Sequence, residues 1–258
     1  MLKKRLIPVL LLKEGMLVRS ERFTEHQVIG TPLHEVKRFN EWNVDELIYL
    51  DITRTGTYDL RRDDHGVQDM KDPLAILDAI SATCFMPLTF GGRLTSVEQM
   101  RAVLSRGADK VTLNSQAVRT PALITEAARA FGSQAIVASI DVKDGHVFID
   151  GGKTRTDHGA VAWAKQVEAL GAGEILLQSI DRDGTAEGYD LELISAVAAS
   201  VRIPVIACSG VGRYEDYPKG IAAGASAVAA ANIWHFKEMA DRGGKRAMKK
   251  AGVDVRVI

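Results

Sequence analysis

Two matching stretches of the sequence contain the residues most suited to proton chemistry. The stretch VASIDVKDG places Asp141 at the end of an apolar run, where a carboxylate can act as a general acid or base. The earlier stretch RLIPVLLLKEG ends in the same way, because Lys13, Glu14 and Gly15 match the residues 130 positions later. Leu11 then matches Asp141, so the first copy lacks the acid. Asp141 could instead cap a turn, since Gly145 follows closely.

Small and polar residues follow other apolar runs and could bind an anion through their backbone N–H groups. They are Gly92 and Arg93, Asn114 and Ser115, Gly210, and Ala231 and Asn232. A glycine pair alone is often a plain turn, but these loops recur at matching positions in the two halves. Two such sites would suit a ligand with a phosphate group at each end.

Further polar residues have two possible interpretations. Asp183 and Gly184 lie in DRDGT, where the aspartate could contact a substrate or only shape a turn. The loop at 51–66 is rich in charge and could be functional or a self-paired, solvated segment; its charged residues include Arg54, Arg61, Arg62, Asp63, Asp64 and His65.

Four charged residues stand at or near the start of apolar runs, with alternating sign. They are Arg5, Glu46, Lys110 and Glu174. They could form a ring at one end of the fold. From the residues alone, a solvated rim is the favoured interpretation.

The elements that must position these residues alternate between short apolar runs and amphipathic segments. Strands are predicted at 6–11, 46–52, 86–90, 110–114, 135–140, 174–180, 203–208 and 227–232. Helices are predicted at 32–42, 72–82, 96–107, 121–132, 159–171, 190–200, 215–224 and 235–252. Strands that are apolar throughout indicate a parallel sheet covered by helices on its outer face.

An internal repeat favours a closed barrel over a doubly wound sheet. Segment 45–57 matches 173–185, and segment 107–115 matches 224–232. Four strand–helix units repeated once give a (β/α)8 (TIM) barrel with a half-barrel repeat, and we expect it to form one domain spanning 1–258.

Composition narrows the possible functions. With 33 basic and 33 acidic residues, the chain has no global charge that would favour nucleic acid or a membrane surface. Two cysteines, Cys84 and Cys208, indicate buried thiols in a reducing compartment, so we expect a cytoplasmic protein. No apolar run is long enough to span a membrane, and 6–12 is predicted to be a strand rather than a signal peptide. The six histidines show no metal-ligand spacing, so neither a metal nor a cofactor is expected.

The whole chain resembles the HisF family, the cyclase subunit of imidazole glycerol phosphate synthase, a lyase of histidine biosynthesis. The resemblance rests on RLIP, DELIYLDIT, GADKVTLN, ITEAARAFGSQ, GAGEILLQSIDRDGT, GYDLELI and IPVIA. It implies a half-barrel repeat, a bisphosphate substrate, and ammonia delivered by a HisH-like glutaminase subunit docked on the amino-terminal face. It also reverses the rim interpretation, since Arg5, Glu46, Lys110 and Glu174 match the family's ammonia gate; Asp109 matches a glutaminase-docking position.

The sequence departs from the family at several positions of the site. The two catalytic aspartates of the family map onto positions 11 and 141, and only Asp141 is present. Arg93 replaces the third glycine of a phosphate loop, while Gln178 and Asn232 replace the usual Thr and Ser.

LLLKEG, TYDLRRDDH and AVAAANIWHF resemble a branch of the family associated with surface-polysaccharide genes. In that branch the barrel is thought to pass ammonia to a separate amidotransferase that makes acetamidino sugars. We therefore expect an ammonia-conducting subunit with little or no cyclase activity. The alternatives are an active cyclase that uses Asp141 alone or with another acid, and a non-enzymatic scaffold that activates the glutaminase.

Overall fold

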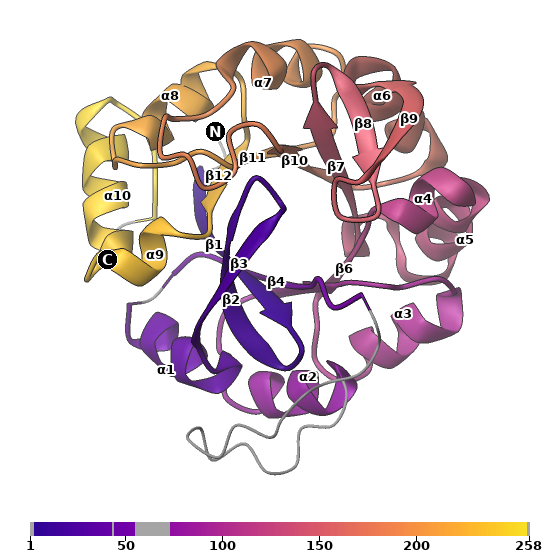
Figure 1. Ribbon diagram of the computed structural model, residues 1–258, viewed down its shortest axis with the longest axis horizontal. Helices are drawn as coiled ribbons and strands as arrows, with labels where there is room; N and C mark the ends of the chain where they lie inside the picture. The colour runs from indigo at the N-terminus through magenta and orange to yellow at the C-terminus, as the bar shows by residue number, and fades with distance from the viewer. Residues whose placement is uncertain (1–2, 43, 55–72, 257–258) are drawn as a thin grey trace.

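The computed structural model describes residues 3–42, 44–54 and 73–256, and their parallel strands form a closed barrel (Figure 1). The barrel strands are β1 (Arg5–Lys13), β4 (Leu47–Asp51), β5 (Leu88–Gly91), β6 (Lys110–Leu113), β7 (Ile136–Lys143), β10 (Glu174–Ser179), β11 (Val205–Cys208) and β12 (Ala227–Ala230). Each pairs in parallel with its neighbours; β10 pairs with β7, and β12 pairs with β1. The predicted (β/α)8 barrel is confirmed.

Helices surround the sheet on its outer side (Figure 1), and many of their apolar residues are buried in the core between helices and strands. They are α1 (Pro32–Trp42), α2 (Pro73–Ser81), α3 (Val97–Leu104), α4 (Ser115–Arg119), α5 (Ala122–Phe131), α6 (Ala160–Leu170), α7 (Leu191–Ala198), α8 (Asp216–Ala222), α9 (Ile233–Phe236) and α10 (Ala240–Lys250). The predicted helix at 235–252 starts too early, because Lys237 is extended and separates α9 from α10.

Two β-hairpins extend the barrel at its carboxyl-terminal end, and the prediction missed both. They comprise β2 (Met16–Glu21) with β3 (Glu25–Gly30), and β8 (His146–Ile149) with β9 (Thr154–Gly159). β2 pairs antiparallel with β1, and β8 with β7. The turns that start them share left-handed conformations, with φ of 52° and 78° at Glu14 and Gly15, and 48° and 74° at the matching Asp144 and Gly145. The repeat seen in the sequence is therefore a repeat of structure.

The apolar core lies on both sides of the barrel wall. The larger part fills the space between strands and helices. The smaller part fills the barrel interior and includes Ile7, Val9, Leu11, Ile48, Val137, Leu176, Ile206, Cys208, Ala227 and Ala229. Within the described ranges, no helix is long and apolar enough to cross a membrane.

Candidate functional site

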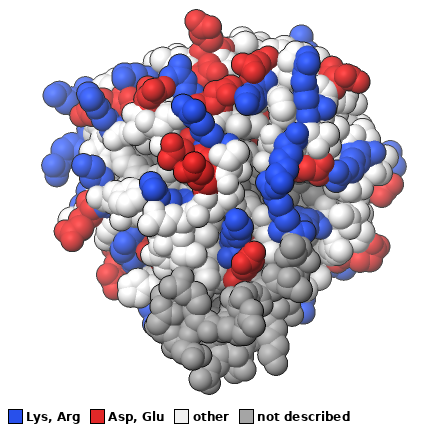
Figure 2. All heavy atoms as spheres, viewed as in Figure 1, with Lys and Arg blue, Asp and Glu red and all other residues white. Residues whose placement is uncertain are grey.

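A cavity of about 1010 Å³ opens at the carboxyl-terminal ends of the strands, between the two hairpins. The catalytic face of a (β/α)8 barrel lies at this end. Figure 2 views this face, where Lys and Arg side chains are interspersed with Asp and Glu. Every residue predicted for catalysis or phosphate binding lines the cavity: Leu11, Gly92, Arg93, Asn114, Ser115, Asp141, Asp183, Gly184, Gly210, Ala231 and Asn232.

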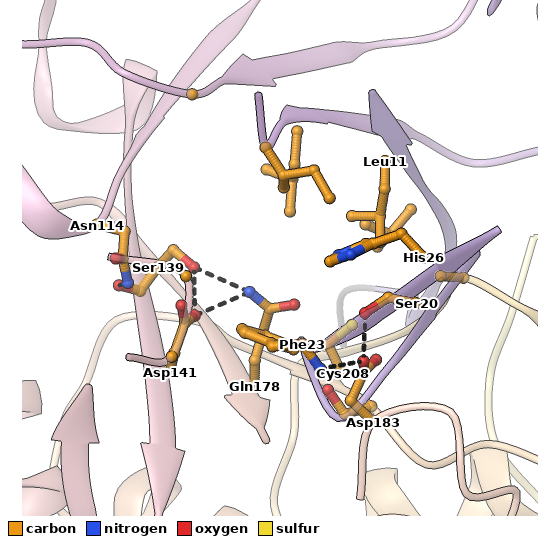
Figure 3. Close-up of a pocket in the computed structure, with 18 of the residues that line it drawn as sticks. Leu11, Ser20, Phe23, His26, Asn114, Ser139, Asp141, Gln178, Asp183 and Cys208 are labelled. Carbon is orange, nitrogen blue, oxygen red and sulfur yellow. Dashed lines mark hydrogen bonds between the residues drawn. The ribbon is translucent and has the colours of Figure 1, made fainter. Parts of the chain in front are cut away.

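Asp141 is the titratable group best placed for proton transfer. It is buried near the end of β7, where its carboxylate accepts bonds from Gln178 Nε2 at 2.9 Å and Ser139 Oγ at 3.2 Å (Figure 3). Burial raises the pKa of Asp141 to about 7, against the opposing effect of these hydrogen bonds. The strand continues through Lys143, so Asp141 is not a turn cap. At neutral pH this carboxyl can both donate and accept a proton.

Leu11 lies on another wall of the cavity from Asp141 (Figure 3). In the sheet it pairs with Val18 of β2 and Leu50 of β4, and its side chain belongs to the apolar interior cluster. It is 9% exposed. The apolar lining of the barrel therefore reaches the floor of the cavity at the position where the matching half has a carboxylate.

Asp183 connects the barrel to the first hairpin. Its Oδ2 accepts a hydrogen bond of 2.7 Å from Ser20 Oγ and one of 3.3 Å from Phe23 N, while its carbonyl oxygen accepts one from Arg22 N. At Gly184, φ is 73° and a Cβ atom would lie 2.6 Å from the Ser20 carbonyl oxygen. Asp183 thus lines the cavity and holds a hairpin above it, which goes beyond shaping its own turn.

The loop after β5 has an internal ion pair where an anion was predicted. Arg93, with a φ of 55°, donates from Nη2 to Asp51 Oδ2 at 2.8 Å. At Gly92 a Cβ would lie 2.2 Å from the Asp51 carbonyl oxygen, so the loop packs tightly on β4. The Arg93 side chain is directed to a buried carboxylate of the protein.

The side chains after β6 also have protein partners. Asn114 Nδ2 donates to the Ser139 carbonyl oxygen at 3.1 Å, and Ser115 Oγ accepts from Asp150 N at 2.9 Å. In this half of the barrel, the residues predicted to hold phosphate make protein contacts that an anion would have to share or displace.

The matching loop after β11 is partly open. Ser209 has a φ of 81°, and its buried hydroxyl has no hydrogen-bond partner in the described part of the chain. The N–H groups of Gly212 and Arg213 donate to Asp216 Oδ2 at 3.2 and 3.0 Å. The sequence does not predict that Asp216 accepts hydrogen bonds from this loop. Its only local signal is that a carboxylate follows shortly after a glycine-containing loop. Asn232 Nδ2 donates to the Ser20 carbonyl oxygen at 2.9 Å.

At the opposite end of the barrel, four charged side chains form a closed ring of ion pairs. Arg5 bonds to both Glu46 and Glu174, and Lys110 Nζ lies 2.8 Å from a carboxylate oxygen of each. Thr89 Oγ1 also donates to Glu46. Both glutamates are buried, so the solvated-rim interpretation is wrong. Although burial acts to raise it, the bonds and charges of Arg5 and Lys110 lower the pKa of Glu174.

Asp109 lies next to this ring, at the start of β6. Its Oδ2 accepts a hydrogen bond of 2.8 Å from Leu88 N, and its own N–H donates to the Leu88 carbonyl oxygen. It therefore fixes the start of β5 against β6. Its predicted docking role stays a prediction.

Two other expectations concern cysteines and metals. Cys208 is buried in the barrel interior, as predicted, whereas Cys84 is only half-buried. In the described ranges there is no group of three His, Cys, Asp or Glu side chains that could hold a metal ion. The charged loop residues 61–65 lie outside the described residues.

The fold and the cavity define a (β/α)8 barrel with a buried carboxyl of raised pKa, Asp141, in a cavity at the carboxyl-terminal ends of its strands. A sequence model of the family described as "Histidine biosynthesis protein" matches residues 5–240, which is nearly the whole chain. The chain belongs to this family, whose barrels are of the HisA and HisF type.

Proposed function

We propose that this barrel is a HisF-like subunit of a glutamine amidotransferase complex that conducts ammonia from a glutaminase, through the barrel, to a separate sugar amidotransferase. Its own cyclase activity is low or absent. The main observation in support is a contrast between the two ends of the barrel. Leu11 extends the apolar interior to the cavity, whereas the ring of ion pairs at the other end is complete; it comprises Arg5, Glu46, Lys110 and Glu174.

The path implied by this proposal has three segments. Ammonia enters at the ion-paired ring, crosses the apolar interior, and leaves through the cavity next to Asp141. Loss of one member of an acid/base pair removes a contribution of about 10²- to 10⁴-fold, which supports a low cyclase rate. The internal Arg93–Asp51 ion pair, at a position predicted to hold phosphate, favours the same conclusion.

The first test supplies ammonium and the family's bisphosphate substrate to the isolated barrel. We expect cyclisation far below the rate normal for the family, and a normal rate would contradict the proposal.

The runner-up function is a working cyclase of histidine biosynthesis. The presence of Asp141 and of a large cavity supports it. Leu11→Asp separates the two: a large gain in cyclisation indicates an otherwise intact site, and no gain indicates a remodelled one.

The second test follows isotope-labelled amide nitrogen from glutamine into an acceptor sugar in a reconstituted three-protein system. We expect the label to reach the sugar even when free ammonia is scavenged.

A barrel that only activates the glutaminase is the non-enzymatic alternative. Ala229→Leu, which adds side-chain volume to the apolar barrel interior, distinguishes conduction from the scaffold. Conduction predicts loss of transfer with glutaminase activation retained, whereas the scaffold predicts no loss. Ala196→Leu, on the exposed face of α7, is the matched control.

A further inference from the structure

Three side chains that can carry positive charge lie together at the cavity mouth. Lys13 Nζ is 3.5 Å from His26 Nδ1, and Arg54 also lines the cavity. Figure 3 shows the His26 ring pointing from the first hairpin into the cavity, beside Leu11. We call Lys13, His26 and Arg54 the basic cluster.

The fold brings these residues together from three separate elements. Lys13 ends β1, and His26 lies on β3, where it pairs with Ser20. Arg54 follows Thr53, whose Oγ1 accepts a hydrogen bond of 2.8 Å from Glu14 N and so ties the end of β1 to the end of β4. The cluster is therefore positioned by the barrel wall as well as by the hairpin.

Arg54 also reaches the second hairpin. Its Nη2 donates to the Gly151 carbonyl oxygen at 3.4 Å, in the turn between β8 and β9. A Cβ atom at Gly151 would lie 2.9 Å from the same nitrogen, so the glycine allows the guanidinium to approach this backbone. The basic cluster thus spans the cavity mouth between the two hairpins.

The cluster has an excess of positive charge. Burial, together with the charges of Lys13 and Arg54, lowers the pKa of His26. In the described ranges, neither Lys13 nor Arg54 forms an ion pair, in contrast to Arg93 with Asp51 and Arg119 with Asp150 in the same cavity. Like charges held close together repel each other, and a bound anion would remove that repulsion.

We propose that the basic cluster binds a phosphate group of a small ligand that occupies the cavity. Lys13, His26 and Arg54 offer an ammonium, an imidazole and a guanidinium at the mouth of one cavity, and donors of this kind suit a phosphate dianion. This site is distinct from the loops that carry Gly92 and Gly210, and it does not depend on the proposed ammonia path.

Calorimetric titration of the full chain with inorganic phosphate and with pyrophosphate tests the proposal, with acetate as a monoanion control. We expect both phosphates to bind more tightly than acetate. Lys13→Met and Arg54→Met should each weaken phosphate binding by about tenfold or more. Lys237→Met, which removes a cavity charge outside the cluster, should change it by less than about twofold at physiological salt.

NMR of the histidine rings locates the anion. Phosphate bound at the basic cluster should raise the pKa of His26, and the rise should disappear in Arg54→Met. Circular dichroism and thermal melting identify any variant that fails to fold, and the titration of His26 in the unmodified chain does not depend on the variants. The proposal is overturned if neither phosphate binds at millimolar concentration or if the His26 pKa is unchanged on saturation. It is also overturned if the backbone amide chemical-shift changes caused by phosphate are confined to Ser209, Gly210 and Val211.

Discussion

Asp141 shows how burial sets the behaviour of a single residue. Its pKa is about 7 in the folded chain, against an ordinary value of 3.8. Between these values the folded state holds a proton that the unfolded state has lost. The folded state therefore loses stability as the pH rises through this window, by at most about 1.4 kcal/mol per pH unit.

Asp141→Asn removes this titration while keeping an oxygen that can accept from Gln178. We expect the Tm of the variant, relative to the unmodified chain, to increase from about pH 4 to about pH 7 and then to level off. Thermal melts across that range measure it. A Tm difference that is the same at every pH would contradict a raised pKa.

At the scale of elements, the first hairpin depends on one carboxylate. Asp183→Ala removes the acceptor for Ser20 Oγ and Phe23 N, at a cost of about 1–3 kcal/mol for groups left without a partner. We expect amide hydrogen exchange over 16–30 to increase by about tenfold or more. The control is Asp181→Ala. Asp181 is an exposed neighbour whose carboxylate accepts a hydrogen bond from Asp144 N, so this variant should leave the exchange over 16–30 unchanged.

The sequence predicts an element well when a local pattern of residues specifies it, and poorly when contacts between distant residues do. Apolar runs and 3.6-residue periodicity are local signals, so the barrel strands and most of the helices were predicted within a few residues. The hairpins were missed, because β3 and β9 are largely exposed and have no apolar pattern of their own. The repeated Lys-acid-Gly turn is their only local signal, and on its own it indicates the half-barrel repeat without predicting a hairpin.

The partners of the site residues were less predictable than their positions. The sequence predicts an anion loop at Arg93, but the pairing of Arg93 with Asp51 depends on how the loop after β5 packs on the end of β4. The same holds for the hydrogen bond between Ser20 and Asp183. Position at the end of a strand follows from local patterns, whereas the direction of a long side chain follows from tertiary packing.

At the scale of the whole molecule, the ring of ion pairs joins β1, β6 and β10 to the residue preceding β4. Lys110→Met would leave Glu46 and Glu174 buried with only Arg5 as a shared partner. We expect a loss of about 3–5 kcal/mol in the free energy of unfolding. Urea denaturation measures this loss. The control is Lys4→Met, because the Lys4 ammonium donates only to the Ala225 carbonyl oxygen among described partners.

The ring also gives this loss a pH dependence. The pKa of Glu174 is lowered in the folded state, so its contribution to stability is present above its ordinary value of 4.5 and is lost as the pH falls. We expect the difference between Lys110→Met and the unmodified chain to shrink under acid conditions. A difference that grows on acidification would contradict this account.

The pairing of β1 with β12 has a consequence for the order of folding. Arg5 lies beside Ala227, so the first barrel strand gains one of its two parallel neighbours only after nearly all of the chain is available. Until then, that edge of β1 presents unpaired N–H and C=O groups next to an apolar surface, which is the arrangement that promotes association between chains. Contacts of such long sequence separation also slow folding. We infer that barrel closure is a late step. Leu11 and Leu12 pair with β4 and with β2 at once, so the β2–β3 hairpin lies on the same edge of β1 as β12, beyond the stretch that β12 covers. Because it forms locally on β1, the hairpin is available much earlier to shield that part of the edge.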